Sequence, residues 1–239
     1  MQLTQHFLTQ NPCYRANVER RDSRYTRFQS RGPMGLMLHS VGCAQPSAEV
    51  FLARWDRPEY TNACVHAVID ANTGEVFQTL PWNFRGWHCG GSGNNTHVGV
   101  ELCEPAALVY GSGGSFTVRD RDAAVAAVRR TWKAAVELFA QLCAEYALDP
   151  MTAICSHREG GRQGIASGHT DPEHLWEGLG LDFTMDGFRT AVRQKLARTQ
   201  TLYRIQLGAF HNKDYAEAWL AKVRTQYPEA YLTRSCAGK

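Results

Sequence analysis

Between residues 20 and 198, short segments with the alternating pattern of β-strands are interspersed with longer segments of helical period. In the clearest helical segment, apolar residues recur at steps of three and four from Val125 to Tyr146. A second amphipathic helix is expected to begin at Thr184. This alternation predicts an α/β domain, in which helices cover a β-sheet.

Five short apolar segments are predicted to be strands, and they span residues 35–40, 65–70, 75–80, 97–102 and 152–156. The turn sequence Ala71-Asn72-Thr73-Gly74 joins the second and third segments and predicts a β-hairpin.

The remaining segments before residue 198 carry weaker signals. A helix is expected from Ser47 to Arg57, with Val50, Phe51 and Trp55 on its inner side. Residues 1–34 are polar and contain Pro12 and Gly32-Pro33, so an irregular segment is expected there. Residues 158–170 are rich in glycine and are expected to form a loop.

The composition excludes several classes of protein. Hydrophobic residues make up 44% of the 239 residues and charged residues 21%, as in chains that bury a core. No apolar run approaches the ~18 residues of a membrane span. The net charge of +3, without a basic stripe, does not indicate nucleic-acid binding. The eight cysteines include no CxxC pair, so packed, reduced thiols are expected rather than a zinc ribbon.

Three polar residues are candidates for a metal site. His39 lies at the polar end of a predicted strand, His157 follows another, and Asp171 lies in the segment SGHTDP. Two histidines and one aspartate, brought together by the fold, would form a catalytic zinc set with a fourth position open for water. Zinc lowers the pKa of that water to ~7. A histidine at a strand end is also a common hydrogen-bonded structural residue, so the spacing alone leaves both roles open.

Other candidate residues lie on the predicted strands or in the loop between them. Glu101 lies inside the apolar strand HVGVEL, where it is either an ion-paired or water-facing residue or a general base. Trp87 and His88 lie in a glycine-rich loop and either contact a sugar or peptide or anchor the loop on the core. His66 lies in a predicted strand, where a core position is the default role.

Five segments occur in an order that resembles a known family. They are LMLHSVG, VHAVIDANTGEVFQTLPW, RGWHCGG, HVGVELCEP and SHREGGRQGIASGHTDPEHLW. In this order the chain resembles the type 2 N-acetylmuramoyl-L-alanine amidases, which are similar to phage lysozyme-amidases and peptidoglycan recognition proteins. The resemblance covers about residues 8–198. It implies a mixed central β-sheet flanked by helices, a zinc ion in a surface groove, and a catalytic domain at residues 1–198.

The resemblance also implies roles for the metal-site candidates. His39 matches the first zinc ligand of the family, His157 the second and Asp171 the third. The family often has a lysine two residues before that aspartate, and the lysine stabilises the transition state. Here His169 occupies the lysine position, and the interval from His157 is longer, so His169 is an alternative third ligand.

Further roles follow from the same resemblance. Glu101 matches the family carboxylate that takes a proton from the zinc-bound water and gives it to the leaving amine of L-alanine. Trp87 and His88 match the loop that borders the groove, and with His66 they are expected to be substrate-binding residues. His169 is then expected to be catalytic, by holding the oxyanion.

Residues 202–239 form a second segment, and YRIQLGAF within it resembles the first half of a SPOR domain, a peptidoglycan-binding module. The pattern predicts a small C-terminal βαβ unit with strands at 202–208 and 229–233 and a helix at 214–226. Such a half would be completed by further sequence or by a second copy in a homodimer, since an exposed edge strand favours pairing. Alternatively, it is an extra βαβ unit packed on the amidase domain.

The predicted function is therefore zinc-dependent hydrolysis of the amide between N-acetylmuramic acid and L-alanine in peptidoglycan. The alternatives are a binding module of the same fold that does not cut peptidoglycan, and a metallohydrolase acting on another amide. The first residues lack the apolar core of a secretory signal. Synthesis in the cytoplasm and phage-type release to the cell wall, as for an endolysin, are expected ahead of an autolysin or recycling role.

Overall fold

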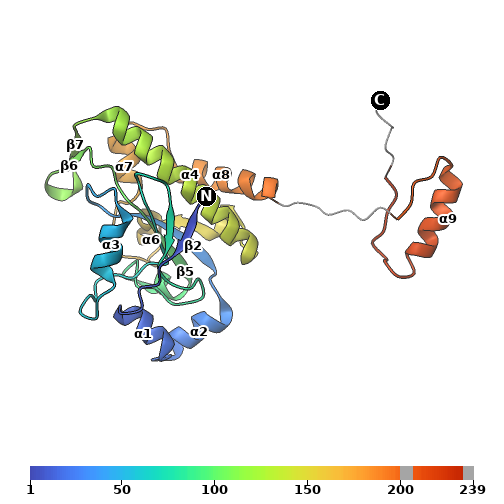
Figure 1. Ribbon diagram of the computed structural model, residues 1–239, viewed down its shortest axis with the longest axis horizontal. Helices are drawn as coiled ribbons and strands as arrows, with labels where there is room; N and C mark the ends of the chain where they lie inside the picture. Colours follow the sequence, from blue (N-terminus) through green and yellow to red (C-terminus); the bar gives the residue numbers. More distant parts are fainter. Residues whose placement is uncertain (200–206, 234–239) are drawn as a thin grey trace. The chain divides into compact units, whose positions relative to one another are not determined.

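The computed structural model describes residues 1–199 and 207–233 of the chain (Figure 1). The chain divides into two compact units, Met1–Thr199 and Gln200–Lys239. In the described part, no helix combines the length and the apolar character that crossing a membrane requires.

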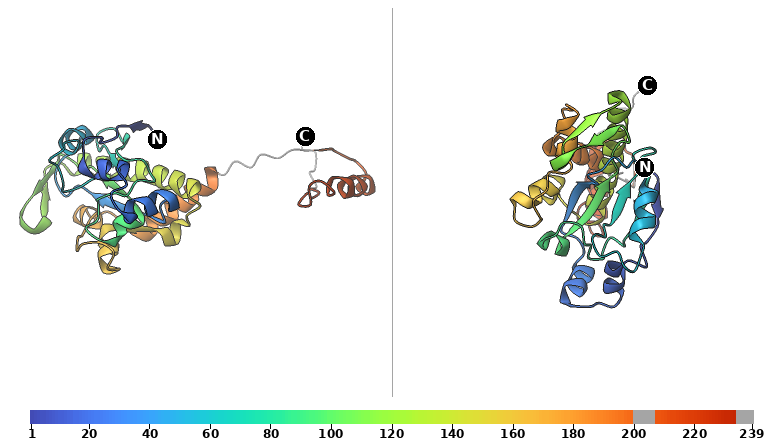
Figure 2. Two further views of the ribbon diagram at one scale, coloured as in Figure 1. Left: turned by 90° about the horizontal axis from the view of Figure 1, so that it is seen from below. Right: turned by 90° about the vertical axis from the view of Figure 1, so that its left-hand side faces the viewer.

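The larger unit is built on a six-stranded sheet with the order β1-β4-β3-β5-β2-β8 (Figures 1 and 2). All neighbouring strands in it are parallel except β3 and β4, which form the predicted hairpin. The expected mixed sheet flanked by helices is thus confirmed. The strands are β1 Leu3–Gln5, β2 Gly35–Ser40, β3 Ala67–Ile69, β4 Val76–Gln78, β5 His97–Leu102 and β8 Ile154–Ser156, and a separate two-stranded sheet pairs β6 Leu108–Tyr110 with β7 Phe116–Val118.

Helices surround this sheet, and α4 and α8 lie side by side (Figure 1). Both predicted long helices are confirmed, because α4 covers the segment ending near Tyr146 and α8 begins one residue after Thr184. The helices are α1 Pro12–Val18, α2 Ser23–Arg31, α3 Ala48–Trp55, α4 Arg121–Glu145, α5 Pro150–Ala153, α6 His157–Arg162, α7 Glu173–Gly178 and α8 Met185–Thr199, with 3-10 turns η1 Ser92–Asn95 and η2 Ser112–Gly114.

The main core lies between the sheet and the pair α4 and α8, where Phe139 and Phe188 are fully buried. Because side chains alternate along a strand, every second residue of β2 and β5 enters this core. His39 and Glu101 alternate with those residues and therefore lie on the opposite face of the sheet. The core residues of the two strands are Leu36, Leu38, Val98, Val100 and Leu102.

The opposite face is partly covered by α1 and α3. Phe51 and Trp55 of α3 are buried there with Val68 of β3. The expectation that Val50 also points inward is wrong, because its side chain is 47% exposed. Buried residues of α3 fall at steps of three and four, and Val50 lies outside that stripe.

The first 34 residues are more regular than expected, since they form β1, α1 and α2. The side chain of Asn11 caps α1, and Asp22 caps α2. Pro12 occupies the first turn of α1, where proline is well tolerated because the helix leaves that N–H unpaired. The prediction treated Pro12 as a helix breaker, although at this position it favours helix initiation.

Residues 158–170 are also not entirely a loop, because α6 begins at His157 and ends at Arg162. Ser156 and Glu159 form a capping box at its start, in which each side chain accepts a hydrogen bond from the backbone N–H of the other residue. The helix was not predicted because Gly160 and Gly161, which disfavour helices, make up two of its six residues.

The cysteines in the described residues are all free thiols. Six of these seven side chains are buried, and Cys43 is exposed. The apolar core, rather than disulfide bonds, therefore holds the larger unit together, in agreement with the expected packed thiols.

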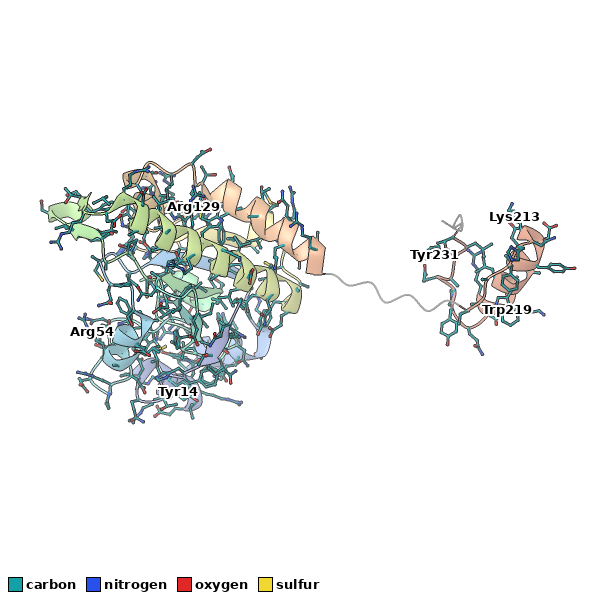
Figure 3. All side chains as sticks on the ribbon, turned by 45° about the horizontal axis from the view of Figure 1, so that its top comes forward. Tyr14, Arg54, Arg129, Lys213, Trp219 and Tyr231 are labelled. Carbon is teal, nitrogen blue, oxygen red and sulfur yellow. The ribbon has the colours of Figure 1, made fainter. Side chains whose placement is uncertain are left out.

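In the smaller unit, α9 spans Lys213–Val223, inside the predicted helix 214–226 apart from its first residue. The predicted strand at 229–233 is wrong, because these residues are irregular, with no described strand beside them to pair with. The other predicted strand, 202–208, lies largely outside the described residues. None of the side chains described in this unit is buried, and Trp219 and Tyr231 project from it (Figure 3).

Candidate metal centre

Three parallel strands end side by side at the candidate site. In the register of β2 with its neighbours, His39 pairs with Glu101 of β5, and Leu38 pairs with Ser156 of β8. His157 follows Ser156 directly and begins α6. Ligands in open α/β sheets bind at the carboxyl ends of strands, so this row is where a site is expected.

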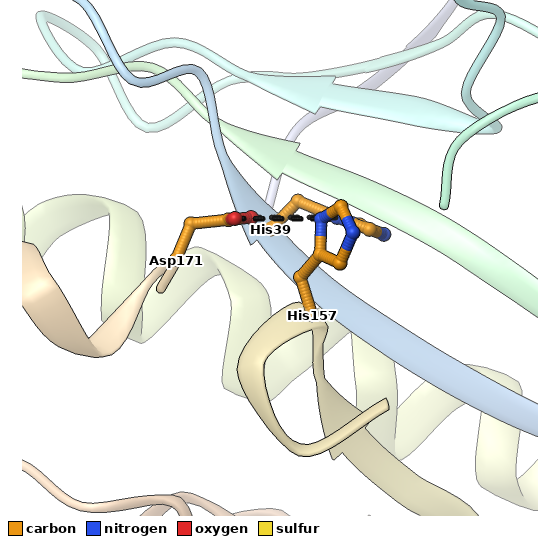
Figure 4. A group of neighbouring side chains, drawn as sticks. All are labelled: His39, His157 and Asp171. Atoms are coloured by element: carbon orange, nitrogen blue, oxygen red, sulfur yellow. Dashed lines mark hydrogen bonds and ion pairs between the residues drawn. The ribbon is translucent and has the colours of Figure 1, made fainter. Parts of the chain in front are cut away.

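Asp171 joins the two histidines from the segment before α7 (Figure 4). The Nδ1 atoms of His39 and His157 are 3.0 Å apart, and the Asp171 carboxylate oxygens lie 3.4 Å and 3.3 Å from them. The backbone N–H of Ser40 donates to Asp171 Oδ2 at 3.3 Å, and that of Arg158 donates to the Asp171 carbonyl at 3.2 Å. Three buried side chains therefore converge with ligand atoms within 4.8 Å of one another.

A chain of hydrogen bonds fixes which nitrogen of His39 carries a proton. His88 Nε2 lies 3.1 Å from the carbonyl oxygen of His97, so it donates to that oxygen. His88 Nδ1 must then accept, and its partner is His39 Nε2–H at 3.0 Å. Burial lowers the pKa of His39 and keeps the ring neutral. The Nδ1 lone pair of His39 therefore points at the cluster.

His157 is held in the same tautomer. The hydroxyl of Ser167 donates to the carbonyl of Cys89 at 3.2 Å, and its oxygen lies 3.1 Å from His157 Nε2. Ser167 thus accepts a hydrogen bond from His157 Nε2–H, and Nδ1 of His157 carries a lone pair. Such outer partners are the arrangement that orients histidine ligands in metal sites.

Two ring lone pairs and a carboxylate thus face one another with no proton between them. A cation bound among the three groups would remove the electrostatic repulsion between the two lone pairs and the carboxylate. Two imidazoles and one carboxylate form a donor set of the kind that zinc takes in catalytic sites, with a fourth position left open.

His169 lies beside this cluster rather than in it. Its ring stacks on His157 with centroids 4.2 Å apart and planes 5° apart, and its Nδ1 is 3.5 Å from Asp171 Oδ1. Its side chain is 56% exposed. The convergent set therefore contains Asp171, and His169 lies where it can reach a bound molecule.

Glu101 faces the same groove from the adjacent strand. Its Oε2 atom is buried and has no hydrogen-bond partner among the described residues. Burial, reinforced by Asp171 and Glu104, raises the pKa of Glu101 well above its ordinary value. A buried carboxyl oxygen without a partner calls for a functional explanation, and here it adjoins the groove.

The groove has a volume of about 660 Å³, and its lining includes Trp87, His88 and Glu101. The indole N–H of Trp87 donates to the hydroxyl of Tyr25 at 3.1 Å, which fixes the ring at the groove wall. His66 is not among the described residues that line the groove. It is fully buried, with both ring nitrogens on backbone groups, which favours the structural role that the sequence left open.

Gly99 makes the placement of His88 possible. A Cβ atom at Gly99 would lie 2.3 Å from Cγ of His88. No real Cβ atom approaches that closely, so any other residue at position 99 would displace His88 and, with it, the hydrogen bond to His39.

A second buried network beside the site was not predicted. Glu104 is fully buried, accepts from the backbone N–H of Gly42 at 3.0 Å, and accepts from the hydroxyl of Tyr110. The Tyr110 oxygen is also 2.9 Å from His174 Nε2. Glu104 therefore links the segment after β2, strand β6 and helix α7. The available signal was a second glutamate, three residues after Glu101, in the apolar segment ELCEP.

Comparisons with known proteins agree with this geometry. A family model described as N-acetylmuramoyl-L-alanine amidase matches residues 29–174, which is more than half of the chain. The chain belongs to the N-acetylmuramoyl-L-alanine amidase family. A SPOR domain model matches residues 186–237 of this amidase-family chain, so that match begins inside α8. Both resemblances noted in the sequence are confirmed.

Individual relatives of this amidase-family chain are distant. It is 33% identical over 78 residues to the N-acetylmuramoyl-L-alanine amidase XlyA of Bacillus subtilis strain 168, across 31% of this chain and 26% of the relative. The chain thus spans about a quarter of the length of that relative.

Solved structures share the fold of this amidase-family chain. The hydrolase AmiA of Staphylococcus aureus, solved in complex with its ligand, is 17% identical with a TM-score of 0.59, covering 82% of this chain and 83% of that chain. The catalytic domain of PlyG is 20% identical with a TM-score of 0.51, covering 85% of this chain and 100% of that chain.

Proposed function

We propose that the protein is a zinc-dependent N-acetylmuramoyl-L-alanine amidase, which hydrolyses the amide between N-acetylmuramic acid and L-alanine in peptidoglycan. The observation that carries this proposal is the pair of inward-facing lone pairs on His39 and His157 beside Asp171, in a chain of this family. His39, His157 and Asp171 would hold the ion. When bound, zinc supplies a Lewis acid that activates water and polarises the carbonyl.

Glu101 is the proposed general base. Its unpartnered Oε2 atom faces the groove, where it takes a proton from the attacking water. The water oxygen bonds to the lactyl carbonyl carbon, and the carbon–nitrogen bond then breaks. Glu101 passes the proton to the departing nitrogen of L-alanine, so the carboxylate is regenerated and the amine leaves neutral.

His169 is the proposed donor to the oxyanion. Stacking on His157 holds its ring beside the cluster, while more than half of its side chain is open to the groove. A donor aimed at the position where charge develops is worth ~10²- to 10³-fold in rate. Trp87 and His88 are proposed to contact the substrate at the groove wall, with His66 supporting them from behind.

The test compares Glu101→Gln with the wild type on purified cell walls, at matched zinc content measured by mass spectrometry. New amino-terminal L-alanine is expected from the wild type and is lost in the variant. Glu49→Gln, at an exposed position of α3, is the matched control and should release alanine like the wild type. A zinc-loaded wild type that binds walls without releasing L-alanine would instead be the non-cutting module of the same fold.

For the smaller unit, we propose that residues 202–239 act as a partial SPOR domain that binds peptidoglycan and pairs with a second copy, while residues 1–198 form the catalytic domain. The SPOR match and the absence of buried side chains among the described residues of this unit support pairing. Light scattering of the full chain should give the mass of a dimer. A monomer that still sediments with cell walls would refute the pairing but not the wall binding.

The proposed place of action is the cell wall, where the substrate lies, reached from the cytoplasm by endolysin-type release. Expression inside a bacterium should then leave cells intact until the membrane is permeabilised, and lysis should follow at once. Lysis upon expression alone would show that the chain reaches the wall by another route.

A further inference from the structure

A second hollow adjoins the groove on the side of α6. Its volume is about 520 Å³, and it is lined by Arg158, Gly161 and Arg162 of α6 together with the loop of Gly168, His169 and Thr170. The three loop residues also line the groove that holds the metal cluster. The hollow, here called the arginine hollow, therefore adjoins the candidate active site across this loop.

The charge of the arginine hollow is positive on every charged side chain that lines it. Two guanidinium groups contribute, and none of the described residues in its lining carries a carboxylate. Glu159, the acidic residue of α6, is engaged elsewhere, because it pairs with Arg189 of α8. Outside the lining, the carboxylate of Glu177 lies beside both arginines, so an anion in the hollow would compete with it for their charge.

The two arginines differ in what they already bind. Arg158 makes a two-pronged contact with Glu177, with distances of 2.5 Å and 2.9 Å, which neutralises it and fixes its position. Arg162 is exposed and makes no ion pair or side-chain hydrogen bond within the described ranges. The charge available for a ligand is thus that of Arg162.

The backbone supports access to this charge. A Cβ atom at Gly168 would meet nothing within 4 Å, so the loop leaves open space between the groove and α6. A chain bound with its scissile amide at the metal cluster can continue past His169 over this glycine and reach Arg162.

We propose that the arginine hollow is a carboxylate subsite, in which Arg162 selects substrates whose stem peptide carries a free carboxylate beyond the scissile amide. This inference rests on the proposed amidase function and adds its substrate class, an acidic rather than an amidated peptide. A guanidinium matches a carboxylate with two parallel hydrogen bonds, which a neutral carboxamide cannot reproduce. Because Arg162 is exposed, solvent screens the pair, and a preference of about two- to fivefold in kcat/KM is expected.

The test uses two synthetic muramyl tripeptides, both ending in L-lysine amide, that differ in one group. One carries L-alanine followed by D-glutamate joined through its γ-carboxyl to the lysine, so that its α-carboxylate is the one free carboxylate, and the other carries the α-carboxamide in its place. The wild type should cleave the carboxylate form about two- to fivefold better. Arg162→Gln should lower kcat/KM for that form alone, so that the two substrates become equal. Arg162→Lys should retain part of the preference that Arg162→Gln loses. Lysine keeps the positive charge but cannot make two parallel hydrogen bonds to a carboxylate.

The control is Arg193→Gln, an exposed arginine of α8 that changes the net charge equally and should leave the preference intact. Equal cleavage of both substrates by the wild type would overturn the inference, as would an equal loss for both in Arg162→Gln. If the wild type cleaves neither, the proposed function fails. Calorimetric binding of the same two peptides then decides the subsite, since a carboxylate preference that Arg162→Gln removes supports it and equal affinities overturn it.

Discussion

The candidate metal centre and helix α9 differ in how their side chains are held. At the metal centre, His39 and His157 are buried, and a named partner occupies the outer nitrogen of each ring. On α9 no side chain is buried, and Tyr215 is 70% exposed. Catalysis requires groups that are oriented before the substrate binds. The larger unit thus holds its candidate site within its own fold, whereas the described side chains of the smaller unit remain accessible, as the proposed binding to peptidoglycan or to a second copy requires.

The largest expected effect comes from removing a metal-centre ring. His39→Ala should abolish stoichiometric zinc binding and lower alanine release by more than the ~10²-fold typical of a lost outer partner. Zinc content by mass spectrometry and release from cell walls measure the two losses. Normal zinc content in this variant would show that the ion, if bound, lies elsewhere.

Gly99→Ala tests whether the centre depends on tight packing behind it. Because the new Cβ would collide with His88, the free energy of unfolding should fall by about 1–3 kcal/mol, with a loss of zinc affinity. Denaturant titration and zinc titration check both effects. The matched substitution at Gly168, where a Cβ has open space, should change neither.

Acid should destabilise the larger unit through His66. Burial lowers the pKa of this ring to about 4, and the Gly99 N–H occupies Nδ1, so the folded ring stays neutral. The unfolded chain binds the proton more readily between pH 6.5 and 4. Stability is therefore full above pH 6.5 and falls by about 3 kcal/mol toward pH 4. Urea unfolding of the metal-free protein should show this slope, and His66→Gln should reduce it by that amount, while His39, His88 and His97, whose pKa values burial also lowers, maintain the rest.

Tyr110→Phe probes the network around Glu104. The variant keeps the ring but leaves a buried carboxylate oxygen and His174 without their shared partner, at a cost of about 1–3 kcal/mol. Thermal unfolding measures this cost. Unchanged stability would mean that the hydroxyl does not link the three segments.

The smallest expected effect is that of Trp219→Ala on the larger unit. Since this side chain belongs to the smaller unit and is 44% exposed, the unfolding of residues 1–199 should shift by less than about 0.5 kcal/mol. Sedimentation with cell walls should nevertheless weaken. A large loss of stability would contradict the contrast between the two regions.

Much of the larger unit could be predicted because its strands are short apolar runs with distinct ends. His39 and His157 could be singled out since each stands at the polar end of such a run, and Glu101 since it interrupts one. The helices of the first 34 residues were missed because they are short and each buries few side chains, such as Tyr25 and Phe28 of α2, so that the caps Asn11 and Asp22 were the main local signals.

The partners of the site residues were equally inaccessible from sequence. Nothing at Ser167 or in the carbonyl of Cys89 indicates which ring lies opposite, since that depends on how loops distant in sequence meet. Local patterns therefore predict which residues have the right chemistry, while tertiary packing decides their protonation.

Two series of hydrogen bonds set the protonation of the His39 and His157 rings, and each series ends at a main-chain carbonyl. The oxygen that orients His88 belongs to residue 97, and the oxygen that orients Ser167 belongs to residue 89. A carbonyl is present whatever side chain follows it, so substitution at these two positions leaves the acceptor in place while the backbone path is kept. The backbone path therefore decides which nitrogen of His39 and of His157 carries the lone pair. Substitutions at residues 89 and 97 should leave that protonation pattern unchanged.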